Sequence, residues 1–152
     1  MKNSRIGTVA LRWALLLVLA LACPLLATSG QTPPSQVQVA RQFLLAMVRG
    51  EWAAAYQWLA PETRHDLSIE QFRTAAQPFL VQSQHYGPVI DLYKLGYRLR
   101  GEETPQPFVA FSFRADTLRR LPHYQLDVTF RDSTTRQVQG FGLVPLLPVS
   151  GR

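Results

Sequence analysis

The spacing of apolar residues changes once along this chain, from a helical period to an alternation of two. Before Gly87-Pro88, apolar residues recur every three or four positions, which predicts amphipathic helices. After this pair, apolar and polar residues alternate in several short runs, which predicts strands with one buried face. Helices followed by such strands indicate an α+β domain, because the helices can cover one face of an antiparallel sheet.

The first predicted helix begins at Ser35, which has the capping-box spacing to Gln38, and it ends at Gly50. The second predicted helix, over residues 51–59, carries apolar residues at helical spacing. Pro61 then restarts the chain, and we expect one further helical turn there.

The third predicted helix is capped by Ser68, with Gln71 three positions later, and we expect it to end at Pro78. Leu67 and Phe72 occupy the two positions of a hydrophobic staple. The helical residues expected to face the core are Val37, Ala40, Leu44, Met47, Val48, Trp52, Ala55, Tyr56, Leu59, Ile69, Phe72, Ala76 and Phe79.

About four strands are predicted after the helices. Their ranges are 89–99, 108–115, 124–131 and 137–145. We expect a register shift in the last strand at Gly140 or Gly142. The alternation places Asp127 on a polar, outward face. The strand residues expected to point inward are Val89, Tyr93, Leu95, Tyr97, Leu99, Val109, Phe111, Phe113, Ala115, Tyr124, Leu126, Val128 and Phe130.

The stretch ARQFLLAMVRGEWAAAYQWLAPETRHDLSIEQF, followed by strands, resembles the nuclear-transport-factor-two-like superfamily of cone-shaped α+β domains. The resemblance extends from about Val37 to Leu143 and is strongest to secreted bacterial branches of unknown function. It implies three N-terminal helices packed on a curved antiparallel sheet of about four strands, a cystatin-like roll with a conical pocket. It implies no particular chemistry, because the fold hosts enzymes, binding proteins and structural modules.

The N-terminal residues have the pattern of a secretory signal peptide over residues 1–29. Lys2 and Arg5 precede an apolar run, and the small residues ATSG follow it. We therefore expect export to the periplasm or the extracellular space. A retained membrane anchor is an alternative, although the run is short for a span.

Cys23 opens a second alternative, because the residues ALA before it loosely resemble a bacterial lipidation motif. Lipidation there would make the protein a membrane-anchored lipoprotein. Cys23 is the only cysteine in the chain, so no internal disulfide can form. The segments expected after the leader are a linker over 30–36, a single domain over 37–145 and a C-terminal tail over 146–152.

The formal net charge of +6 is partly due to the leader. Without Lys2, Arg5 and Arg12, 13 basic and 10 acidic side chains remain, a net charge of +3. Because no clustered basic stripe is present, the sequence does not predict nucleic-acid binding.

Asp91 is the candidate general base. By alternation it shares an apolar strand face with Tyr93 and Tyr97, and a carboxyl in an apolar cone would have a raised pKa. We consider catalysis by Asp91 with Tyr93 on this basis. His85 and His123 lack neighbours at metal-ligand spacing, so no metal or other cofactor is predicted.

His65 and Asp66 lie just before the Ser68 cap and are interpreted as a helix-entry turn. Several aromatic residues could line a ligand pocket or could simply fill the core. These residues are Trp52, Tyr56, Phe72, Tyr93, Tyr97 and Phe111.

The sequence thus favours an exported, non-enzymatic domain that binds a small apolar ligand or a protein partner, with a homodimer through the sheet as one arrangement. A small lyase or isomerase with an acid/base in the cone, and a lipid-anchored structural module of the envelope, are the alternatives.

Overall fold

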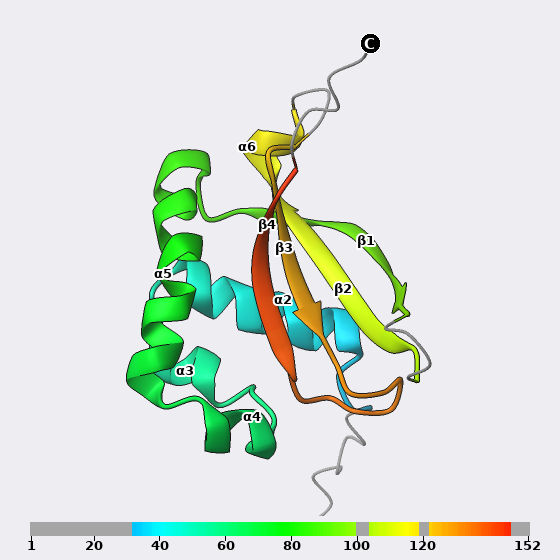
Figure 1. Ribbon diagram of the computed structural model, residues 1–152. Helices are drawn as coiled ribbons and strands as arrows, with labels where there is room; N and C mark the ends of the chain where they lie inside the picture. The colour runs from blue at the N-terminus through cyan, green and yellow to red at the C-terminus, as the bar shows by residue number, and fades with distance from the viewer. Residues whose placement is uncertain (1–31, 100–103, 119–121, 147–152) are drawn as a thin grey trace, which may run out of the picture. The chain divides into compact units, whose positions relative to one another are not determined.

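The computed structural model describes residues 32–99, 104–118 and 122–146 of the 152-residue chain (Figure 1). The compact unit from Pro34 onward contains all the helices and strands described below. The helices are α2 (Gln36–Val48), α3 (Trp52–Tyr56), α4 (Pro61–Asp66), α5 (Ile69–Tyr86) and α6 (Arg114–Thr117). The strands are β1 (Ile90–Arg98), β2 (Gln106–Phe113), β3 (Tyr124–Thr129) and β4 (Gly140–Pro145).

The four strands form one antiparallel sheet in the order β1-β2-β3-β4, and the helices pack against it. The predicted α+β class is therefore confirmed. In Figure 1, β1 lies at the sheet edge away from α5, while α2 passes behind the sheet. The second predicted helix is shorter than expected, since α3 ends at Tyr56, and α6 was not predicted.

Both predicted capping boxes are present. The Ser35 side chain accepts the Gln38 amide at the start of α2, and Ser68 does the same for Gln71 at the start of α5. Gly50 has φ of +74°, a left-handed conformation that ends the first helix at the predicted residue.

The prediction that α5 ends at Pro78 is wrong, because the helix continues to Tyr86. Pro78 lies on the exposed face, whereas Phe79 is 1% exposed. Ser83 is also buried, and its hydroxyl donates to the Val48 carbonyl at 2.7 Å. Packing of this face outweighs the hydrogen bond that proline removes.

Phenylalanine rings fill the space between the helices and the sheet. The centroid of the Phe141 ring lies 5.5 Å from Phe43, 5.3 Å from Phe72 and 6.0 Å from Phe79. Edge-to-face contacts at these distances stabilise a core beyond the burial of apolar area. Ile69, which was expected to share this core, is 39% exposed and is a correction to the predicted stripe.

The face predicted to be buried on β1 is exposed. Ile90 is fully buried, but the five residues expected to point inward are 40–76% exposed. These five residues are Val89, Tyr93, Leu95, Tyr97 and Leu99. The reason is that β1 is an edge strand that extends past the helices, so alternation alone does not bury its apolar side chains.

The register shift predicted for the last strand is also wrong. The pairing of β3 with β4 runs without a shift, and the shift lies instead between Leu92 and Lys94 of β1. Gly140 instead allows a close approach of the two strands, since a Cβ at this position would lie 2.8 Å from the Thr129 hydroxyl oxygen. Ala115, expected to face inward from a strand, lies exposed in α6.

Candidate functional site

The exposed apolar surface of β1 is the most unusual feature of the described chain. On the strand, Leu95 is 61%, Tyr97 62%, Leu92 47% and Tyr93 40% exposed, and Leu99, directly after the strand, is 76% exposed. Single exposed apolar residues are common on soluble proteins, but contiguous groups mark binding surfaces. We call these five residues the β1 surface.

A shallow groove of about 210 Å³ adjoins the β1 surface. Leu95 and Tyr97 contribute to its wall, and Gln36 and Val37 at the start of α2 form another part. The Gln36 amide donates to the carbonyl oxygens of Asp132 and Thr135, which ties the start of α2 to the β3–β4 connection. The groove is therefore bounded by segments that are held in place.

Asp91 does not fulfil the role of a general base in an apolar cone. Its two carboxylate oxygens accept from the Arg114 guanidinium at 2.8 Å each, and its side chain is 38% exposed. The hydrogen bond from Arg114 lowers the pKa of Asp91, whereas the sequence-based hypothesis required a raised pKa. Tyr93, its predicted partner in catalysis, lies on the exposed β1 surface.

Asp116 and His123 form a carboxylate–imidazole pair that the sequence did not reveal. Asp116 is fully buried and accepts from the backbone amides of His123 and Tyr124 at 2.6 and 3.0 Å. Its other oxygen lies 2.7 Å from His123 Nδ1. Because the two residues lie seven positions apart, a spacing that matches no motif, the sequence pattern does not indicate the pair. By accepting from these two backbone amides, Asp116 holds the start of β3 in place, and we call this arrangement a structural clip.

The His123 ring also packs beside Tyr86, with centroids 6.3 Å apart and planes at 22°. Tyr86 stacks in turn on Phe113. A buried carboxylate can orient a histidine for acid–base chemistry. Among the described residues, however, no serine, threonine or cysteine side chain is hydrogen-bonded to this imidazole.

Asp127 lies on the outer sheet face, as its alternation predicts, but it is only 2% exposed. Arg98 extends from β1 past β2 to form an ion pair with it, and the Gln125 amide also donates to the carboxylate. The Arg98 guanidinium lies 4.9 Å from the centre of the Phe108 ring. The neighbouring Gln125 and Thr129 are buried as well. An outward position in a strand is therefore not the same as exposure to solvent.

The six residues predicted to line a pocket do not converge on one. Phe72 and Phe111 are completely buried in the core, while Trp52 and Tyr56 are partly buried against it. The Tyr56 hydroxyl donates to the carbonyl oxygens of Arg64 and Leu67 at 3.1 and 2.8 Å, which fixes the α4–α5 connection. Tyr93 and Tyr97 lie outside the core on β1.

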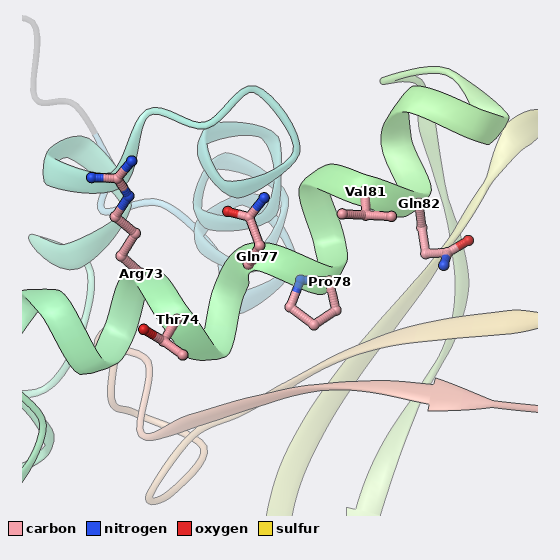
Figure 2. A pocket seen from close by; sticks show the side chains of 6 residues that line it. All are labelled: Arg73, Thr74, Gln77, Pro78, Val81 and Gln82. Atoms are coloured by element: carbon pink, nitrogen blue, oxygen red, sulfur yellow. The ribbon is translucent and has the colours of Figure 1, made fainter.

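A second groove, of about 600 Å³, runs along α5 at Pro78 (Figure 2). The residues that line it are Arg73, Thr74, Gln77, Pro78, Val81 and Gln82. All six come from this one helix, and the side chains other than Pro78 and Val81 are polar. The groove thus lacks a second wall among the described residues, and it is a weaker candidate than the β1 surface.

Cys23 and the predicted signal peptide over residues 1–29 lie outside the described residues. No helix in the described part of the chain is long and apolar enough to cross a membrane. Residues 32–99, 104–118 and 122–146 contain no group of three or more potential metal ligands. His65 and Asp66, at the end of α4, are exposed.

Comparison of the chain with protein-family models, with curated proteins and with solved structures finds no match. The interpretation of the site therefore depends on its own geometry.

Proposed function

We propose that this chain is an exported, non-enzymatic domain that binds another polypeptide through β1. The observation that carries the proposal is the β1 surface, a group of large apolar side chains on an edge strand. Among the described strands, β1 has a hydrogen-bonded neighbour on one side only, so its outer edge offers unpaired backbone groups. Partner strands add to such edges through main-chain hydrogen bonds, and apolar side chains beside the edge provide selectivity.

A polypeptide partner fits this geometry better than a small ligand in a cone. We retain the resemblance to the cone-shaped superfamily as part of the proposal. In that superfamily's fold, a ligand would lie in a pocket between the helices and the sheet. Phe43, Phe72, Phe79 and Phe141 occupy that space with mutual ring contacts. The available apolar surface lies instead on the outside of the domain, at β1.

A photo-crosslinking experiment in cells that produce and export the chain tests the proposal. A benzophenone amino acid replaces Tyr97 on β1 or, as the matched control, Val81 on α5, which is 48% exposed. Position 97 should give a discrete light-dependent adduct whose partner peptide is identified by mass spectrometry, and position 81 should not. Absence of an adduct at position 97, or the same adduct at both positions, would refute binding through β1.

A further inference from the structure

The geometry points to a second copy of this chain as the polypeptide that β1 binds, an inference that rests on the function proposed above. The two copies would pair their β1 strands antiparallel about a two-fold axis and so continue the sheet from one copy into the other. Of the two edges of the described sheet, β1 is suited to this pairing. It has nine residues and no proline, whereas β4 has six, two of them glycines, and ends at Pro145.

The pairing of β1 with β2 fixes the face that each β1 side chain occupies, because paired residues of antiparallel strands share a face. Leu95 pairs with Val109, a core residue, so Leu95 lies on the helix side of the sheet. Lys94 pairs with Ala110 and lies on the opposite side. The helix-side residues are Leu92, Leu95 and Tyr97, and the outer-face residues are Asp91, Lys94, Gly96 and Arg98.

Three two-fold registers near the middle of β1 match like faces, and charge distinguishes them. An axis at Lys94 would place the two Lys94 side chains opposite each other. An axis at Gly96 would place Lys94 opposite Arg98 of the second copy. Like charges directly opposite destabilise a strand pair. An axis at Leu95 avoids both contacts, because Lys94 then faces Gly96 of the second copy.

The register about Leu95 is also complementary elsewhere along the strand. After the bulge at Tyr93 is taken into account, Asp91 falls opposite Arg98 of the second copy. In this register Asp91 and Arg98 keep their present partners, Arg114 and Asp127, and their opposite charges would attract across the strand pair without a direct ion pair. On the helix side, Leu92 would face Tyr97 of the second copy, and Leu95 would face Leu95 of the second copy.

The same register would bring together the apolar side chains that one copy leaves exposed. Leu95 and Tyr97 also wall the 210 Å³ groove beside α2, so the helix sides of the two β1 strands would form one apolar strip. An edge strand with this much apolar surface is otherwise an aggregation hazard, and closed two-fold pairing removes the hazard.

Disulfide trapping tests both the partner and the register. The chain as recovered from expressing cells carries Cys23→Ala, which removes its only native thiol, together with either Leu95→Cys or Tyr97→Cys. Residues on a two-fold axis of antiparallel strands have Cα atoms about 4.5–5.5 Å apart, within disulfide range. Two copies of residue 97 would be offset by about four positions, or about 13 Å, and cannot bridge. Mild oxidation should therefore give a covalent dimer with Cys at 95 and not at 97.

Analytical ultracentrifugation of the same chain without new cysteines supplies the second measurement. It should show a concentration-dependent dimer, and Leu95→Arg, which places two positive charges on the axis, should raise its dissociation constant at least about tenfold. Val81→Arg on α5 is the matched control and should leave the dimer unchanged.

A chain that stays monomeric at every concentration, or that bridges through residue 97 as readily as through residue 95, would overturn this inference. If such a monomer still forms a cross-link through position 97 to a different polypeptide, the proposed binding function stands and only the identity of the partner is wrong. If neither dimer nor cross-link forms, both proposals fail.

Discussion

Replacing Asp116 by alanine should destabilise the fold strongly, because one buried carboxylate satisfies three donors. The backbone amides of His123 and Tyr124 donate to it at 2.6 and 3.0 Å, and His123 Nδ1 lies 2.7 Å away. A buried donor left without a partner costs about 1–3 kcal/mol. The imidazole is 44% exposed and can turn to water, so the two amides carry most of the cost. We expect Asp116→Ala to lower the free energy of unfolding by about 3 kcal/mol.

Urea denaturation followed by tryptophan fluorescence measures this loss, since Trp52 and Trp58 pack partly buried against the core. With a slope of about 1.5 kcal/mol per molar urea, a loss of 3 kcal/mol lowers the midpoint by about 2 M. Asp116→Asn should lose less, because its amide oxygen can still accept one of the backbone donors.

Asp91→Ala is the matched control, because it removes a carboxylate that is paired at the surface with Arg114. Exposed ion pairs contribute little to stability, so the midpoint of this variant should move only slightly. If Asp116→Ala moved the midpoint no further than Asp91→Ala does, the pair of Asp116 and His123 would not be a structural clip. A functional role for the imidazole would then need to be reconsidered.

Two further outcomes follow from local geometry. Hydrogen bonds from Thr134 and Thr135 lower the pKa of Asp132 well below its usual range. The ionised carboxylate therefore stabilises the fold above about pH 4, and this contribution is lost as the pH falls toward the folded-state pKa. Asp132→Ala should therefore flatten the decline in thermal midpoint between about pH 4 and pH 2, and an unchanged decline would contradict this. Pro78→Ala should raise the thermal midpoint by about 4–10 °C, because it restores an amide donor inside α5. As the control, Gln77→Ala at the exposed neighbouring position should change the midpoint little. A lower midpoint for Pro78→Ala would mean that the proline geometry is required.

The helical half of the fold was predictable because its signals are local. The caps at Ser35 and Ser68 act through residues three positions away, and the glycine at position 50 acts through its own φ angle. The end of α5 was not predictable by the same means. Whether Pro78 stops the helix depends on the partners of the following turn, and the bond from Ser83 to Val48 spans 35 residues.

The candidate site was harder to predict, because it depends on which strand lies at the edge. Alternation in β1 and β3 is equally clear in the sequence, yet Leu95 is 61% exposed and Leu126 is buried. Asp127 shows the same limit, since it lies on the outer face, is 2% exposed and forms an ion pair with Arg98 from two strands away. Sequence periodicity assigns a side chain to a face of the sheet, whereas burial depends on what lies over that face.

This difference is itself an argument about β1. The strand has an alternating apolar pattern like that of the central strand β3, and the described chain places it at an edge. Edge strands that remain solvent-exposed usually carry charges, proline or a bulge, and β1 has Lys94, Arg98 and a bulge at Tyr93. Beside these features it also exposes leucine and tyrosine on the helix side of the sheet. The exposed apolar side chains of β1 would be covered if β1 became a central strand in a dimer of this chain. The proposed register about Leu95 would give β1 that position, because it is the register that keeps Lys94 away from Lys94 and Arg98 of the second copy.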